Sequence, residues 1–250
     1  MLVDTHFHFD GNDKNEIKEL VDAARKVKVH YMIASGSDLS DNFLNIEKFK
    51  DFDNIFFSCG YHPEVCNDVK EDDYKNLELL LNNKKVVAIG EIGLDYHYGK
   101  DDRNKQIELF KRQLDLATKY NLPVVIHTRD AFLDTYNILK NYKLKGVIHC
   151  FSGSNETAKQ YISLGYFLGI GGVVTFKNSK LKDVLKEIGI NNIVLETDSP
   201  YLSPFRGSKN EPKNIIVIAE FISEYLNIPI EKIEKVTTDN VKQLFNIDIQ

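Results

Sequence analysis

Two histidines, His6 and His8, stand two positions apart near the start of the chain, in the segment Val3-Asp4-Thr5-His6-Phe7-His8. The segment has the pattern of a β-strand, on which side chains two positions apart point to the same face. Two imidazoles at the C-terminal end of a strand are able to hold one metal ion between them. The same spacing also occurs where polar residues simply end a strand at solvent, so the metal hypothesis needs further ligands elsewhere in the chain.

Further polar side chains occupy equivalent places, at or just after the C-terminal ends of other apolar segments. They are His62, Glu91, His127, His149 and Asp198. Together with His6 and His8, this set contains five of the seven histidines of the chain. One such histidine is most simply explained as a satisfied core residue, but the recurrence at strand ends indicates a common site.

The segments that carry these residues are eight short, mainly apolar predicted strands separated by helical patterns. The predicted strands are 3–8, 29–36, 55–60, 86–92, 123–127, 146–150, 166–170 and 192–196. Continuous apolar runs are typical of parallel strands that are covered by helices. Eight strand–helix units in 250 residues match the size of a TIM-type (β/α)8 barrel, with an open doubly wound sheet as the alternative. No linker-like composition break is present, so we predict a single α/β domain over residues 1–250.

In a barrel the C-terminal ends of all strands converge on one face, where the polar set would meet. Four imidazoles and two carboxylates suit a divalent metal, but six ligands are too many for one open catalytic zinc. We therefore predict two ions that share Glu91. The first site would consist of His6, His8, Glu91 and Asp198, and the second of Glu91, His127 and His149. Two divalent ions and two carboxylates leave a net positive cleft that favours an anionic substrate and a phosphorane-like transition state.

The overall composition is that of a globular protein, with 42% hydrophobic and 28% charged residues. The net charge of −5 argues against a surface coated in positive charge for non-specific nucleic-acid binding, but not against a nucleic-acid enzyme with a local positive cleft. Three cysteines without a CxxC motif indicate neither a disulfide framework nor a cysteine zinc site. With no leader-like start and no apolar run of about 18 residues, we expect a cytoplasmic, monomeric protein with no membrane contact.

Six motifs in order give the chain a resemblance to the TatD-like metal-dependent deoxyribonucleases of the amidohydrolase superfamily. They are Val3-Asp4-Thr5-His6-Phe7-His8, Gly60-Tyr61-His62-Pro63, Gly90-Glu91-Ile92-Gly93-Leu94-Asp95-Tyr96, Pro123-Val124-Val125-Ile126-His127-Thr128-Arg129, His149-Cys150-Phe151-Ser152-Gly153 and Glu196-Thr197-Asp198-Ser199-Pro200-Tyr201-Leu202. The resemblance implies a TIM-type barrel with one or two divalent cations (Mg, Mn or Zn), held by the ligands named above. It also implies hydrolysis of DNA phosphodiester bonds, often as a 3′-to-5′ exonuclease acting on single strands or 3′ ends.

One segment departs from the family pattern. The family usually has a longer Pro-x-Pro-His-Arg-Gly segment after Pro-Tyr-Leu, whereas residues 203–212 here are two residues shorter and lack that histidine. The metal ligands are unaffected by this change. The substrate contacts of the loop, and therefore the preferred nucleic acid, are left open by it.

The expected mechanism uses a water that is acidified by the metal ions as the nucleophile. Glu91 would hold both ions, and Asp198, a ligand with a second oxygen near the water, would act as the general base. His62 would hold phosphate oxygens together with the metals. Its alternative role is purely structural, in the turn before Pro63.

Three further residues are candidate substrate contacts. Arg129 and Arg206 would add forked contacts to phosphate, or they are ordinary surface arginines. Tyr201 would stack on a base, or pack beneath its loop. Asp95 either orients a metal ligand or is a turn residue.

Two other functions compete with DNA hydrolysis. A related metallohydrolase that cleaves an amide, a lactone or an aminoacyl-tRNA ester would have the same metal core. The absence of a lysine at the strand-four ligand position disfavours only the members that use a carbamylated lysine. A non-catalytic binding scaffold predicts a broken ligand set, whereas all six ligands are present here.

Overall fold

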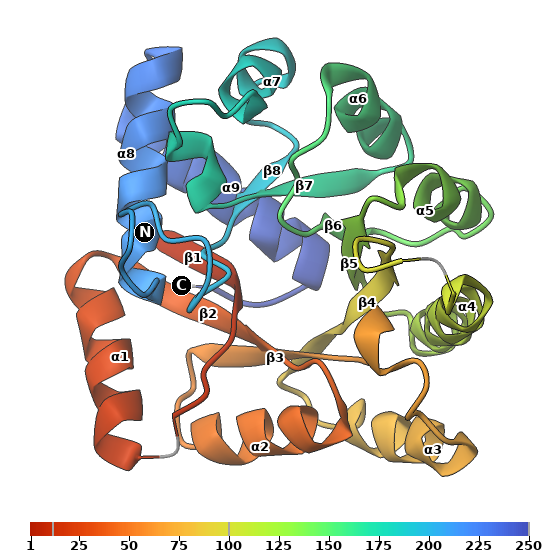
Figure 1. Cartoon of the computed structure of the whole chain (residues 1–250). Coiled ribbons are helices and arrows are strands. Elements are labelled where there is room, and N and C mark those ends of the chain that lie inside the picture. The colour runs from red at the N-terminus through yellow and green to blue at the C-terminus, as the bar shows by residue number, and fades with distance from the viewer. Residues whose placement is uncertain (12, 100, 250) are drawn as a thin grey trace.

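The computed structural model describes residues 1–11, 13–99 and 101–249. Eight parallel strands form one sheet in chain order, with helices between them (Figure 1). The strands are β1 Leu2–Phe7, β2 Val29–Ser35, β3 Ile55–Cys59, β4 Val86–Asp95, β5 Val124–Arg129, β6 Gly146–Ile148, β7 Tyr166–Ile170 and β8 Ile193–Leu195.

The sheet closes where β1 meets the segment that follows β8. The backbone N–H of Asp198 donates to the carbonyl of His6 at 2.9 Å, and the N–H of His8 donates to the carbonyl of Ser199 at 2.7 Å. Phe7 and Ser199 form a parallel bridge at the same place. The predicted TIM-type (β/α)8 barrel is therefore confirmed, and the open doubly wound sheet is excluded.

Helices surround the barrel and also close one of its ends. Their bounds are α1 Lys14–Lys26, α2 Leu39–Phe49, α3 Glu71–Leu80, α4 Arg103–Tyr120, α5 Phe132–Leu139, α6 Asn155–Ser163, α7 Leu181–Ile188, α8 Ile215–Leu226 and α9 Ile230–Phe245. Short 3₁₀ turns lie at η1 Pro63–Val65, η2 Gly172–Thr175 and η3 Pro212–Asn214. Within the described ranges, no helix combines the length and the apolar character that crossing a membrane requires.

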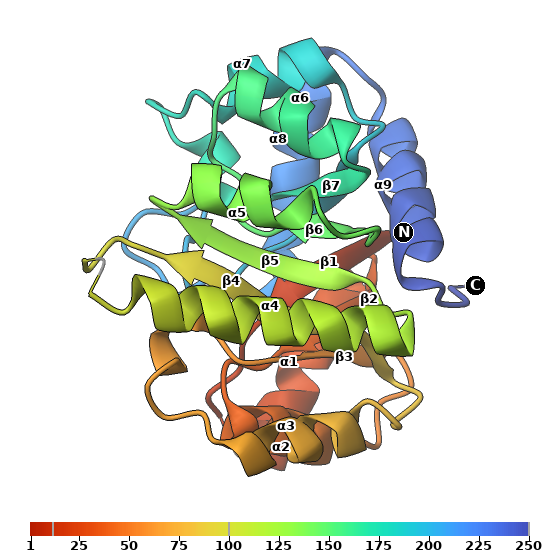
Figure 2. The same cartoon turned by 90° about the vertical axis from the view of Figure 1, so that its right-hand side faces the viewer.

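The two ends of the barrel are not equivalent. In Figure 2 the arrowheads of β4 and β5 point left, whereas α9 and both termini lie at the right-hand end. An apolar cluster joins the barrel interior to α9; it includes Val3, Ile33, Val87, Val125, Val147, Val194, Val241, Leu244 and Phe245. This packing fills the N-terminal end, so polar chemistry is left to the C-terminal end.

Three strand ends, those of β4, β6 and β8, differ from the sequence prediction in a way that shapes the site. β4 continues to Asp95, which pairs with Arg129, so Asp95 lies on a strand and not in a turn. β6 and β8 are instead shorter than predicted. The chain turns soon after them, with Cys150 at φ 45° and Asp198 at φ 55° in the left-handed region.

Candidate metal centre

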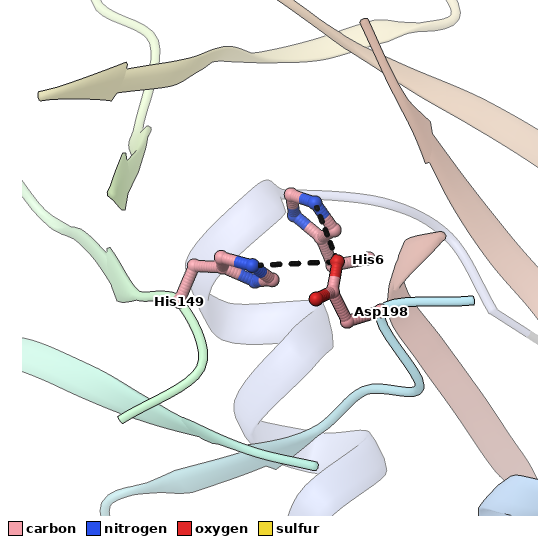
Figure 3. A group of neighbouring side chains, drawn as sticks. All are labelled: His6, His149 and Asp198. Carbon is pink, nitrogen blue, oxygen red and sulfur yellow. Dashed lines mark ion pairs between the residues drawn. The ribbon is translucent and has the colours of Figure 1, made fainter. Parts of the chain in front are cut away.

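The six predicted ligands meet at the C-terminal mouth of the barrel. His6, Glu91 and His127 lie within β1, β4 and β5, whereas the other three follow strand ends. Figure 3 shows His6 and His149 pointing toward the carboxylate of Asp198. Residues more than a hundred positions apart are thus brought together by closure of the barrel.

The first group of ligands surrounds one oxygen of Glu91. The Nε2 atoms of His6 and His8 lie 3.0 Å apart, and Glu91 Oε2 is 3.4 Å from the first and 3.7 Å from the second. Asp198 Oδ1 lies 3.8 Å from His6 Nε2 and 3.6 Å from His8 Nε2. These four residues are the ones predicted for the first site.

The second group surrounds the other oxygen of Glu91. Oε1 lies 2.7 Å from His127 Nδ1 and 3.8 Å from His149 Nε2. His62 Nε2 is also 3.8 Å from Oε1, and the His62 ring stands edge-on to His127 at 4.4 Å between centroids. The two oxygens of Glu91 therefore face different imidazoles, as a bridging carboxylate would. The two groups adjoin at His149, whose ring stacks on that of His6 at 3.6 Å between centroids and whose Nε2 lies 3.6 Å from Asp198 Oδ1.

The spacing of these atoms fits divalent ions. Metal–ligand bonds of about 2.0–2.2 Å in a tetrahedral arrangement place neighbouring ligand atoms roughly 3.3–3.6 Å apart. Several distances in both groups lie close to this range, and those of 3.6–3.8 Å are too long for hydrogen bonds within the protein. The chemistry of the donors, neutral imidazoles with carboxylates, suits a metal of borderline character.

Three buried or half-buried groups hold the imidazoles from behind. Ser35 Oγ lies 3.1 Å from His6 Nδ1, and Asp95 Oδ2 lies 2.9 Å from His127 Nε2. Glu196 Oε1 lies 3.2 Å from His149 Nδ1. The contacts to His6 and His127 fix the ring orientation and the tautomer, so that the opposite nitrogen faces the ligand cluster. The approach of Glu196 to His149 is that of an ion pair and makes no hydrogen bond to Nδ1.

Glu196 is the functional candidate that the sequence reasoning missed, although it lies within a quoted motif. Its side chain is fully buried, and Oε1 also accepts the N–H of Cys150 at 2.5 Å. Space for it comes from Gly169 on β7, where an added Cβ would lie 2.3 Å from Glu196 Oε2. The sequence indicated this role only by a carboxylate at the end of a predicted strand and a glycine on the neighbouring strand.

Charge and burial act against one another at the centre. Burial raises the pKa of Glu91, but the charge of His149 and hydrogen bonds from His127 and His6 outweigh it and hold that pKa well below its usual range. Burial lowers the pKa of His62 to about 4. Glu91 is therefore ionised and His62 neutral near pH 7.

The metal-free protein should lose stability as the pH rises from about 6.5 to about 9. Burial lowers the pKa of His127, but hydrogen bonds with Asp95 and Glu91 outweigh it and raise the pKa from 6.5 to about 9. The folded state thus binds this proton more tightly than the unfolded state. The resulting stabilisation is fully present below pH 6.5 and is lost as the pH rises through about 9. Urea unfolding of chelator-treated protein at several pH values measures it. His127→Asn should make the profile shallower, although not flat because the pKa of His149 is also raised, and an unchanged profile in that variant would contradict the assignment.

A glycine allows β4 to approach β5 beside the ligands. Gly93 has φ 149°, and a Cβ there would lie 1.9 Å from the carbonyl oxygen of His127. Gly93→Ala should therefore destabilise the protein by about 2–4 kcal/mol, because two backbones must separate. Gly165→Ala is the matched control: its φ is also positive, at 89°, but nothing lies within 4 Å of the added Cβ. Chemical denaturation of both variants measures the difference, and equal losses would rule out the backbone clash as the cause.

The oxygens of Asp198 are both engaged. Oδ1 faces the imidazoles, with His149 Nε2 at 3.6 Å, and Oδ2 accepts the thiol of Cys150 at an S···O distance of 3.6 Å. The second oxygen, expected to be free, thus has a weak donor beside it. A thiol is a poor hydrogen-bond donor, so this contact with Oδ2 is weak.

The predicted substrate contacts are placed unevenly around this centre. His62 is next to the ligands, and the ring of Tyr201 lies 6.3 Å from that of His8. The guanidinium of Arg129 lies 5.6 Å from the centroid of the Tyr98 ring, and Arg206 is exposed in the β8–α8 connection. Within residues 1–11, 13–99 and 101–249, neither arginine forms an ion pair with the six ligands.

Comparison with known proteins identifies the family. The family model described as TatD related DNase matches residues 3–246. A relative from Bacillus subtilis (strain 168), YabD, is 39% identical over 99% of this chain and 100% of its own length. A second, YcfH of Escherichia coli (strain K12), is 38% identical over 99% of this chain and 96% of its own. Both are described as uncharacterized metal-dependent hydrolases.

Solved structures agree with these matches. YjjV, a TatD homologue from Escherichia coli K12, superimposes with a TM-score of 0.90 at 29% identity, over 99% of this chain and 98% of its own. A TatD family hydrolase from Entamoeba histolytica gives a TM-score of 0.87 at 26% identity, over 98% and 97%. An amidohydrolase from Saccharomyces cerevisiae, at 18% identity, shares the fold with a TM-score of 0.79 over 98% and 99%. The chain therefore belongs to the TatD-related DNase family of metal-dependent hydrolases, within the amidohydrolase fold.

Proposed function

We propose that this hydrolase cleaves phosphodiester bonds of DNA, from the 3′ end of a single strand, with two divalent ions. The observation that carries the proposal is the position of Glu91, whose two oxygens face two groups of imidazoles. A pair of ions held in this way suits phosphoryl transfer, because attacking and leaving oxygens both develop negative charge. The family description points in the same direction.

The residues divide the work as follows. His6, His8, Glu91 and Asp198 would hold one ion, and Glu91, His127 and His149 the other. When bound, the ions supply an acidified water and neutralise charge on the phosphate. Asp198 takes a proton from the nucleophile, and its backbone, fixed to β1 through His6, keeps the carboxylate in place.

His62 is assigned to the phosphate. Its Nδ1 accepts the backbone N–H of Glu64 at 3.3 Å, so the neutral ring carries its proton on Nε2. Nε2 points toward the centre, with Glu91 Oε1 at 3.8 Å. An N–H donor there is suited to a non-bridging phosphate oxygen. The 3₁₀ turn that begins at Pro63 thus sets the tautomer that the phosphate contact requires.

The test is hydrolysis by purified protein that has first been stripped with a chelator. Single-stranded DNA labelled at the 3′ or the 5′ end is offered with added Mg²⁺, Mn²⁺ or Zn²⁺. Early release of the 3′ label, with shortening 5′-labelled products, is expected only when metal is restored. If an aminoacyl ester or an amide is hydrolysed and DNA remains intact, the substrate assignment is wrong while the metal centre stands.

A further inference from the structure

One side of the barrel mouth exposes aromatic rings and cations together. We call this the mouth strip; its residues are Phe176, Lys177 and Lys180 after β7, and Tyr201, Phe205, Arg206 and Lys209 after β8. The side chain of Tyr201 is 59% exposed, that of Phe205 52% and that of Phe176 37%. Large rings left in solvent beside a catalytic mouth indicate a ligand surface more often than a folding requirement.

The two connections that form the strip lie against one another. A Cβ at Gly172, in η2, would lie 2.2 Å from the carbonyl oxygen of Leu202 and 3.2 Å from the nitrogen of Pro204. The β7–α7 and β8–α8 connections are accordingly neighbours in Figures 1 and 2, on the side of the strand arrowheads. The two halves of the strip are therefore carried by adjoining connections, and the strip borders the metal centre through Tyr201, whose ring is near His8.

The shortened loop is a built structure that presents its tip outward. The hydroxyls of Ser203 and Ser208 lie 3.0 Å apart, and Ser203 Oγ accepts the N–H of Phe205 at 3.2 Å. The buried Asn210 amide donates to the carbonyls of Thr197 and Tyr201, each at 2.7 Å. Exposure of Phe205 is thus imposed by an ordered turn.

Charge is distributed unequally across the mouth. In the part of the chain that the structure describes, Lys177, Lys180, Arg206 and Lys209 are exposed and no carboxylate lies within 4 Å of their charged nitrogens. The opposite side, formed by the connections after β1 to β3, carries Asp10, Asp38, Asp41 and Glu64.

A cleft of about 470 Å³ beside His8 has the same unequal distribution of charge. Asp10, Glu16 and Glu19 line it from the first strand–helix unit. Lys209 lines it from the β8–α8 connection, beside Glu211 and Lys213, which pair with one another at 2.6 Å. A polyanion is repelled from the first wall and attracted to the second. A strand whose end is held at the metals therefore leaves over the strip.

We propose that the mouth strip is the track for a single-stranded nucleic acid, with bases stacked on Tyr201, Phe205 and Phe176 and phosphates beside Arg206 and the lysines. The inference rests on the proposed function and names the part of the substrate that the metal centre does not hold. Aromatic rings interleaved with cations bind single strands without reading sequence, because every base offers a π-face. A duplex hides those faces and does not use the track.

The experiment compares a thymidine 12-mer with a thymidine dinucleotide as substrates for wild type, Phe205→Ala and Arg206→Ala. Loss of one stacking ring should raise KM for the 12-mer about tenfold, with a much smaller effect on the dinucleotide. Phe43→Ala is the matched control: Phe43 is exposed to 46% on α2, on the acidic side, and its KM should equal that of wild type. Arg206→Ala should also reduce the salt dependence of KM for the 12-mer, since one phosphate contact is lost.

The outcomes test the track separately from the proposed nuclease activity. If wild type hydrolyses the 12-mer and neither variant changes its KM, the track is wrong and the nuclease stands. If wild type hydrolyses neither substrate, the proposed function fails. The track is then judged by fluorescence anisotropy of a labelled 12-mer with chelator-treated protein. Binding that is weakened by Phe205→Ala and not by Phe43→Ala supports it, and no binding by wild type overturns it.

Discussion

Replacing Glu91 by Ala should abolish hydrolysis and weaken the binding of both metal ions. Glu91 is buried, and one of its oxygens faces His6 and His8 while the other faces His127 and His149. Loss of the bridge removes a ligand from each site and leaves His127 with Asp95 alone. We expect activity to fall by at least about 10²–10³-fold, the scale on which single preorganised groups act.

Metal content by elemental analysis and hydrolysis of labelled DNA measure the two effects in parallel. Glu47→Ala is the control, because Glu47 is an exposed carboxylate that pairs with Lys50 and should leave both quantities unchanged. Thermal unfolding shows whether Glu91→Ala is folded. Full metal-dependent turnover by folded Glu91→Ala would refute the bridging role.

The ligand positions could be predicted from the sequence because of a regularity of parallel barrels. Each strand is an apolar run, and the first polar residue after it marks the C-terminal mouth. His127 ends the apolar run of β5 and His149 directly follows β6, whereas after β8 the first polar residue is Glu196 and Asp198 comes two residues later. Chain order alone places them at one end, so no knowledge of side-chain contacts was needed.

The contacts behind the ligands could not be predicted in this way. Whether Glu196 reaches His149, and whether Ser35 reaches His6, depends on the register between neighbouring strands. Register is set by closure of the whole sheet and leaves little trace in any one segment. For Asp95 the sequence allowed both an orienting role and a turn, and continuation of β4 beside β5 favours the first.

The loop at 203–212 illustrates a different difficulty. Its departure from the family pattern is plain in the sequence, but the consequence depends on where the tip points. Ser203 and Ser208 close a short turn, and Asn210 fixes its base, so Phe205 and Arg206 face solvent at the mouth. The loop is shorter than the family pattern and lacks its histidine, but it carries an aromatic ring and a cation at its tip.

Asp198→Asn should reduce kcat by about 10²–10⁴-fold, the range for loss of a general base, with a smaller effect on KM. The side-chain amide has the size of the carboxylate, and the backbone N–H of residue 198 still donates to the carbonyl of His6. The amide accepts no proton, however. One ligand of the first group is also weakened. Metal binding at that group should therefore decrease, while the group around His127 retains its ion.

Cys150 provides the control that separates these two roles of Asp198. Its thiol donates to Oδ2, whereas Oδ1 faces the imidazoles, so Cys150→Ala leaves the metal-facing oxygen untouched. The change removes only a weak hydrogen-bond donor from Oδ2, the oxygen proposed to accept the proton. We expect kcat to change by less than about threefold, because such a contact is weak. If Asp198→Asn keeps near-normal kcat at saturating metal, the proton goes elsewhere and Asp198 is not the general base. If kcat falls while both metals remain bound, the loss lies in proton transfer, and Asp198 acts as a base in addition to being a ligand.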